Sequence, residues 1–261
     1  MPPEPPEPPE PPARPVDPAA AGPAGGGAAA PPLGIVFDLD GTLIDSRRDI
    51  ATAINRMRAE RHLAPLSVDE VAGMVGEGAR MLVRRALPPR PPGAGKDDLK
   101  EALASYLAHY AEVCLATTRP YPGIAAMLAT LAPSFALAVL SNKGEALSRR
   151  ILQGLGLDRY LREVVGGDSL PTRKPNPGGL YLLADRLAIA APRLLLVGDT
   201  WIDARTAQAA GCAFALTLWG EPRGSEPAVA ATPPDPLDAV SGWRLAHPRD
   251  LPAALGLTED A

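Results

Sequence analysis

The stretch LGIVFDLDGTLIDS, residues 33–46, decides the fold. It begins with a short apolar run, which is typical of a buried strand, and then changes to acidic and turn-forming residues. Asp38 and Asp40 are two residues apart, so on an extended chain both side chains project to one side. The stretch therefore predicts a strand that carries two carboxylates to a sheet edge, although turn-forming Asp and Gly after a strand would give the same pattern.

Similar apolar runs recur along the chain and alternate with helical patterns. Strands are expected at Phe135–Leu140, Glu163–Val165, Leu194–Val197, Ala213–Leu218 and Trp243–Leu245, and a short helix is expected at 249–256. Apolar residues at helical spacing separate these runs, and Gly154, Gly156 and Gly211 are placed to end helices. Strands that alternate with helices predict an α/β fold, with a Rossmann-like parallel sheet covered on both faces.

Residues 46–118 have a different pattern and are predicted to form an all-helical domain inserted after the first strand. Apolar residues recur at helical spacing near 50–57, 79–86 and 99–110, and no stretch between them is typical of a strand. A proline-rich loop, PPRPPGAGK (88–96), separates the last two patterns. The α/β core is accordingly expected to comprise residues 33–45 and 119–261.

Residues 1–32 hold 13 of the 32 prolines and open with a PPE repeat. We expect a disordered tail of polyproline II and Gly-Ala linker, because it lacks the apolar content to offset its ordering entropy. Such a tail could be the ligand of a proline-binding domain or an extension without a partner. A stretch without charges between Arg119 and Lys143 is long enough to suggest a membrane span. Because Pro133 divides it, we expect a buried helix, turn and strand instead.

Charge and cysteine content narrow the function further. The 261 residues include 30 acidic and 26 basic side chains, for a net charge of −4, which argues against nucleic-acid binding through bulk charge. Two cysteines, Cys114 and Cys212, exclude a disulfide framework and indicate a reducing compartment, so a cytoplasmic location is expected.

Three further motifs follow predicted strands or the loops after them. Ser141 in LSNK (140–143) lies next to a helix start, where anions bind, and prolines on both sides stiffen the backbone that holds Lys174 in RKPNP (173–177). Asp199 ends a strand, and Asp203 lies one helical turn later. Taken singly, these residues fit a helix cap, an exposed loop lysine and first-turn acids. Together they predict a site, because ligands of α/β sheets bind at the carboxyl ends of the strands.

The ordered set of DxDGT, Ser, Lys and GDxxxD resembles the haloacid dehalogenase superfamily, specifically its magnesium-dependent phosphatases, over residues 33 to about 220. The stretches most similar to its phosphoglycolate phosphatase-like members are GGDSLPTRKPNP (166–177), LLLVGDTWIDARTAQAAGC (194–212) and VGEGARMLVRRAL (75–87). The resemblance implies a parallel-sheet core with an inserted helical cap. It also implies hydrolysis of small phosphate monoesters, with 2-phosphoglycolate as the expected substrate and glycolate as the product.

The resemblance also implies the catalytic roles. Asp38 would attack phosphorus and form an aspartyl-phosphate, and Asp40 would be the general acid and base. Ser141 and Lys174 would hold the phosphoryl oxygens. Dehalogenases of the superfamily have no counterpart of Asp40, so its presence favours phosphoryl chemistry.

A magnesium ion is the expected cofactor. By resemblance it is held by Asp38, Asp199 and the backbone carbonyl of Asp40, with Asp203 binding directly or through water. The physical reason is repulsion, because like charges about 4 Å apart repel by about 4 kcal/mol even at an effective dielectric constant of 20. A hard divalent cation with oxygen ligands relieves that repulsion.

The other expected substrate contacts lie beside these motifs: Gly41, Thr42, Ser141, Asn142 and Lys143 near the phosphate, and Arg80 in the cap. Lys143 and Arg80 are the candidates for binding a substrate carboxylate, although Arg80 fits a solvated helix face equally well. A phosphosugar mutase or phosphatase, a pyrophosphatase and a non-catalytic binding protein remain alternatives. Either a monomer or a homodimer is compatible with the sequence, and no membrane partner is expected.

Overall fold

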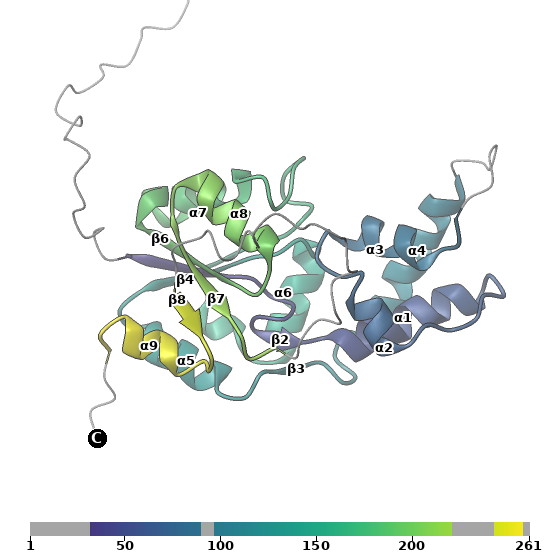
Figure 1. The fold of residues 1–261 in the computed structure, drawn as a ribbon, viewed down its shortest axis with the longest axis horizontal. Coiled ribbons are helices and arrows are strands. Elements are labelled where there is room, and N and C mark those ends of the chain that lie inside the picture. Colours follow the sequence, from purple (N-terminus) through teal and green to yellow (C-terminus); the bar gives the residue numbers. More distant parts are fainter. Residues whose placement is uncertain (1–31, 90–96, 221–242, 258–261) are drawn as a thin grey trace, which may run out of the picture. The chain divides into compact units, whose positions relative to one another are not determined.

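The computed structural model describes residues 32–89, 97–220 and 243–257. The predicted tail up to residue 31, and the proline-rich loop beyond Pro89, lie outside these residues. A six-stranded parallel sheet has the order β5-β4-β1-β6-β7-β8 (Figure 1). Its strands are β1 (Gly34–Phe37), β4 (Ala136–Leu140), β5 (Glu163–Val165), β6 (Leu194–Gly198), β7 (Ala213–Thr217) and β8 (Trp243–Leu245). The predicted fold class and its last short strand are therefore confirmed.

Strand β1 is the point at which the strand order changes direction. It pairs in parallel with β4 on one side and with β6 on the other. In open α/β sheets, ligands bind outside the carboxyl ends of the strands at such a switch point. The residues that follow β1, β4 and β6 are therefore the ones that this topology brings to one edge.

Helices cover both faces of the sheet (Figure 1). One face buries Val36 against α7 (Gly178–Leu187) and α8 (Trp201–Ala210). The neighbouring residues of β1, Ile35 and Phe37, point the other way and join the core beneath α5 (Ile124–Leu131), α6 (Glu145–Gly154) and α9 (Asp250–Ala254). Two 3₁₀ turns, Asp158–Tyr160 and Ala191–Arg193, precede β5 and β6.

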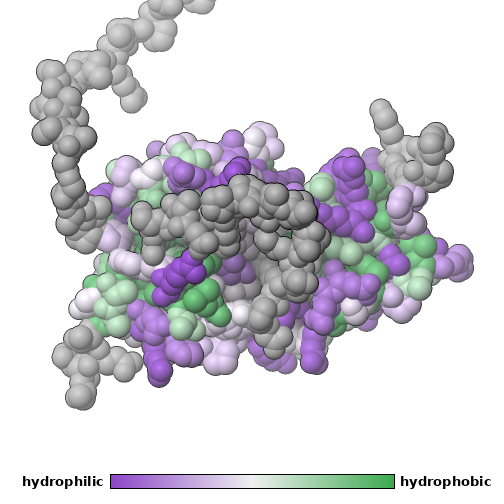
Figure 2. All heavy atoms as spheres, viewed as in Figure 1, coloured by the Kyte–Doolittle hydropathy of each residue, from purple (hydrophilic) through white to green (hydrophobic). Residues whose placement is uncertain are grey.

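The uncharged stretch between Arg119 and Lys143 forms helix α5 and strand β4, as predicted. Among the residues that the structure describes, none of the helices combines the length and the apolarity that a bilayer crossing requires. On the face drawn in Figure 2, hydrophilic side chains are spread over the sheet region and the inserted helices, with smaller apolar patches between them.

In the described part of the chain, four helices lie between β1 and α5: α1 (Arg47–Ala59), α2 (Val68–Ala72), α3 (Ala79–Ala86) and α4 (Asp97–Val113). Helix α1 packs against α4 and α2. Helix α2 could not be predicted from the sequence, because five residues are too few to show a helical period. Its only local signal is a capping box, in which Ser67 and Glu70 bind each other's backbone N–H.

The chain enters and leaves this helical insert at one place. Strands β2 (Ile44–Asp45) and β3 (Arg119–Pro120) pair in antiparallel fashion there. The carboxylate of Asp49, which is 1% exposed, accepts hydrogen bonds of 2.6–3.0 Å from the backbone N–H and hydroxyl groups of Thr117 and Thr118. The start of α1 is thereby fastened to the segment that leads back to the sheet.

Candidate active site

Asp38 and Asp40 leave the end of β1 and line one cavity. The backbone N–H of Asp38 still donates to Val197 on β6, at 2.9 Å, so the sheet fixes its position. Gly41 then turns the chain with a φ of 88°, in the left-handed region that favours glycine. Asp40 accepts a short hydrogen bond from the Ser46 hydroxyl and is 2.6 Å from the Lys143 ammonium. The two carboxylates are therefore held by different partners on one side of the strand end.

Lys174 is buried between two carboxylates. Its Nζ lies 2.9 Å from Asp38 Oδ1 and 2.7 Å from Asp203 Oδ1, and its side chain is 2% exposed. Burial opposes the charge on Lys174, but the neighbouring Asp203 and Asp38 outweigh it and raise the lysine pKa above its usual range. Burial also raises the pKa of Asp38 to about 6; Lys174 opposes this change, and the charges of Asp203 and Asp40 reinforce it. The site therefore holds more negative charge than one ammonium can balance.

Asp203 has two tasks at the start of α8. Its Oδ2 accepts from the backbone N–H and hydroxyl of Thr200, at 3.1 and 2.6 Å, and caps the helix, while Oδ1 faces Lys174. Gly198 permits this arrangement, because a Cβ atom there would overlap the Asp203 carboxylate. Asp199 accepts a 3.2 Å hydrogen bond from the hydroxyl of Thr42.

The carboxylate of Asp199 completes a cluster with those of Asp38 and Asp203. One oxygen each from Asp38, Asp199 and Asp203 lies within 4.8 Å of the others. Hard oxygen donors with surplus negative charge are the ligand set that a hard divalent cation prefers. The residues present therefore fit a divalent metal site.

The loop after β4 links the sheet edge to the helical insert. The side-chain amide of Asn142 donates to the backbone carbonyls of Gly76 in the insert (2.8 Å) and Lys174 in the core (3.0 Å). Ser141 lines the cavity, and its Oγ accepts from the Lys143 backbone N–H at 3.2 Å. The structure thus brings Ser141, Asn142 and Lys143 to the same edge as the acidic residues.

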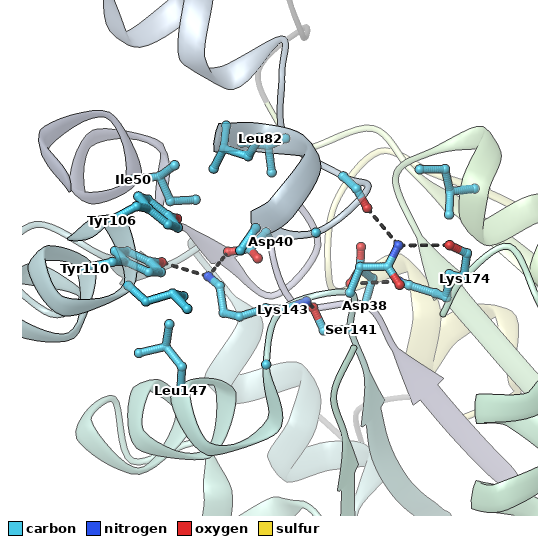
Figure 3. A pocket seen from close by; sticks show the side chains of 18 of the residues that line it. Asp38, Asp40, Ile50, Leu82, Tyr106, Tyr110, Ser141, Lys143, Leu147 and Lys174 are labelled. Atoms are coloured by element: carbon cyan, nitrogen blue, oxygen red, sulfur yellow. Dashed lines mark hydrogen bonds and ion pairs between the residues drawn. The ribbon is translucent and has the colours of Figure 1, made fainter. Parts of the chain in front are cut away.

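The cavity lies between the sheet edge and the insert and measures about 60 Å³. A cavity of roughly 10–15 Å³ holds one water molecule, so this cavity has room for a small molecule. Polar residues line its sheet side, and Ile50, Leu82, Tyr106 and Tyr110 line the other side (Figure 3). A substrate in it would contact both parts of the chain.

Three of the predicted substrate residues lie outside the lining of the main cavity. Thr42 is fully buried beside Asp199, and Gly41 borders a smaller hollow that shares Asp40 with the main cavity. Arg80 is exposed and borders a separate hollow. Helix α3 directs Ala79 and Leu82 into the main cavity, whereas Arg80 lies outside its lining.

Tyr110 is a residue of the site that was not predicted from the sequence. Its hydroxyl lies 2.7 Å from Lys143 Nζ, although it comes from α4 (Figure 3). In the sequence it forms part of an apolar stripe. The signal that could have revealed it is a tyrosine in a buried stripe, because a buried tyrosine hydroxyl usually has a hydrogen-bond partner.

The chain is similar to known proteins. The family model described as haloacid dehalogenase-like hydrolase matches residues 35–217. A phosphoglycolate phosphatase of Rhodospirillum rubrum is 41% identical over 235 residues, which cover 87% of this chain and 96% of the relative. One of Aquifex aeolicus is 39% identical over 188 residues, covering 71% of this chain and 84% of the relative.

Solved structures show the same likeness. The crystal structure of a predicted phosphoglycolate phosphatase from Haemophilus somnus has a TM-score of 0.75 and 28% sequence identity. The match covers 85% of this chain and 97% of that one. The chain described above belongs to the haloacid dehalogenase-like hydrolases.

Proposed function

We propose that this hydrolase is a Mg²⁺-dependent phosphatase of small phosphate monoesters, with 2-phosphoglycolate as its substrate and glycolate as the product. The observation that carries the proposal is the meeting of Asp38, Asp40 and Lys174 in one small cavity, where the carboxylates of Asp199 and Asp203 cluster with that of Asp38. Relatives named phosphoglycolate phosphatase, of which one is 41% identical, support the choice of substrate. A cytoplasmic location remains a prediction.

The proposed reaction has two displacement steps at phosphorus. A carboxylate oxygen of Asp38 forms a bond to phosphorus while the bond to the leaving oxygen breaks, which gives an aspartyl-phosphate. Asp40 donates a proton to the leaving alkoxide. Water then attacks phosphorus, Asp40 takes its proton, and inorganic phosphate leaves as the Asp38 carboxylate is restored.

The surrounding residues act by position and charge. Lys174, held within 2.9 Å of Asp38, would bind a phosphoryl oxygen, and Ser141 would donate to another. Mg²⁺ bound by Asp38, Asp199, Asp203 and the backbone carbonyl of Asp40 would offset the negative charge of the phosphoryl group. We also propose that helices α1–α4 act as a cap that excludes water from the cavity.

The Asp38→Asn variant tests the proposal. With 2-phosphoglycolate and Mg²⁺, it should lose phosphate release by a factor on the order of 10⁴ or more, because the amide cannot serve as the nucleophile. Circular dichroism should show an unchanged fold. A matched control is Asp185→Ala, since Asp185 is exposed on α7 and lies outside the cavity lining.

Two results would contradict the proposal. Normal turnover by Asp38→Asn would remove Asp38 from the mechanism. Transfer of the phosphoryl group back to a sugar phosphate, without release of inorganic phosphate, would identify a mutase instead.

A further inference from the structure

Two lysines line the cavity, and they are placed differently. Lys174 contacts Asp38 and Asp203, on the phosphoryl side of the site. Lys143 lies nearer the insert, and its Nζ contacts Asp40 at 2.6 Å and the Tyr110 hydroxyl at 2.7 Å (Figure 3). An ammonium has three N–H donors, and the described residues accept only two of them here. The third donor of Lys143 is thus available to a molecule in the cavity.

Tyr110 fixes the direction of that ammonium. It is 1% exposed and stacks on Tyr106, with ring centroids 5.7 Å apart and an interplanar angle of 14°. The Lys143 ammonium also lies 4.9 Å from the Tyr110 ring centroid, within the range of a cation–π contact. A rigid aromatic pair from α4 therefore holds a charged group that belongs to the core.

Apolar side chains form most of the remaining wall: Ile50, Val75, Leu82, Leu107, Leu147 and Ile202. These six side chains offer no hydrogen-bond partner to the hydroxyl groups of a sugar or to a nucleobase, and only a few polar side chains, such as Asn142 and Thr200, accompany them in the lining. Buried polar groups without partners disfavour binding. The cavity therefore suits a short leaving group that carries one anionic group.

The position of Lys143 also sets the length of that leaving group. In 2-phosphoglycolate, three bonds of about 1.2–1.5 Å join the bridging oxygen to a carboxylate oxygen, so the two atoms are less than about 4 Å apart. A bridging oxygen within hydrogen-bond reach of Asp40 thus brings the carboxylate within reach of the ammonium that contacts Asp40. A longer leaving group would carry its charge past Lys143 toward the apolar wall.

Resting on the proposed phosphatase activity, we propose that Lys143, oriented by Tyr110, is the receptor for a single carboxylate on a two-carbon leaving group. It selects carboxylate-bearing esters over neutral esters of equal length. Because one partner comes from the core and the other from α4, the receptor is complete only while the insert covers the site.

The test compares two substrates of equal length, 2-phosphoglycolate and 2-hydroxyethyl phosphate. The measured quantity is the ratio of their kcat/KM values, which cancels losses that affect both reactions. Lys143→Met should lower this ratio by about tenfold or more, the effect of one charge-assisted hydrogen bond. Tyr110→Phe should lower the ratio a few-fold, mainly through KM for 2-phosphoglycolate. Lys143→Arg, which keeps the positive charge, should lower the ratio less than Lys143→Met does.

Tyr181→Phe is the matched control, since it removes the hydroxyl of an exposed tyrosine on α7 that lies outside the cavity lining. Its ratio should stay within about twofold of the wild type. An unchanged ratio in both Lys143→Met and Tyr110→Phe would overturn the inference. So would an equal loss of both substrates in Lys143→Met, because Lys143 would then act only through Asp40.

A failure of the proposed function would look different. In that case the wild-type protein would release phosphate from neither ester in the presence of Mg²⁺. If Lys143→Met does not fold, Tyr110→Phe and Lys143→Arg still decide the outcome, because both retain most of the side-chain volume.

Discussion

Replacing Asp49 by alanine should destabilise the protein markedly, although Asp49 is remote from the proposed chemistry. The change removes the only described acceptor of the Thr118 backbone N–H and hydroxyl, which bind Asp49 at 2.9 and 2.7 Å. Thr118 is fully buried, so water cannot replace the lost partner, whereas Thr117 is exposed. At about 1–3 kcal/mol for each unsatisfied buried group, we expect a loss of about 2–4 kcal/mol in the free energy of unfolding.

Urea and thermal unfolding at pH 7 would measure this loss. For a chain of this size, about 3 kcal/mol corresponds to a Tm lower by roughly 6–12 °C. The control Asp185→Ala should stay within about 0.5 kcal/mol of the wild type, because Asp185 is exposed and has no described partner. A loss below about 1 kcal/mol for Asp49→Ala would refute the reasoning.

The loss should also depend on pH. Burial opposes the ionisation of Asp49, but hydrogen bonds from Thr117 and Thr118 outweigh it and lower the pKa of Asp49 below its usual range. The stabilisation by Asp49 is therefore fully present above its pKa in the unfolded state, about 3.9. It is lost as the pH falls through the lower pKa of the folded state. The difference in the free energy of unfolding between wild type and Asp49→Ala should therefore be smaller at pH 3 than at pH 7. A difference that stays constant would contradict the assigned cause.

Two further predictions concern the site itself. Asp40→Asn should lower kcat/KM, which reports the first displacement, by about 10²–10⁴-fold for alkyl phosphates but much less for p-nitrophenyl phosphate, whose leaving group needs no proton; equal losses in kcat/KM would exclude a general acid. Gly198→Ala should displace the Asp203 carboxylate, which a Cβ atom would overlap. The affinity of the Gly198→Ala variant for Mg²⁺, measured by calorimetry, should fall by about tenfold. An unchanged affinity would show that Asp203 does not hold the ion.

The core strands could be predicted from the sequence because each is an apolar run between turn residues. Strand β6 is buried throughout, and its neighbours follow the same rule. Strands β2 and β3 could not be predicted, because two residues have no period and their pairing joins positions far apart in the chain. The hydrogen bond between Thr118 and Asp49 could not be predicted for the same reason, since 69 positions separate the two residues.

The motif residues that meet at the sheet edge were identified by their order and by strand topology. The residues of the insert were harder to assign, because the direction of a helical side chain depends on how the whole helix packs. Arg80 and Leu82 are two residues apart on α3, yet only Leu82 faces the cavity. Helical spacing alone could not decide which of them does.

The paired strands β2 and β3 have a consequence for how this architecture can be altered. Asp45 and Arg119 are partners in that ladder, so their Cα atoms are only about 5 Å apart. A short turn could bridge such a gap. The segment between them could therefore be excised, or exchanged for a domain of another protein, without any change in the strand order of the large sheet. A domain grafted at this junction would cover the same sheet edge with different side chains.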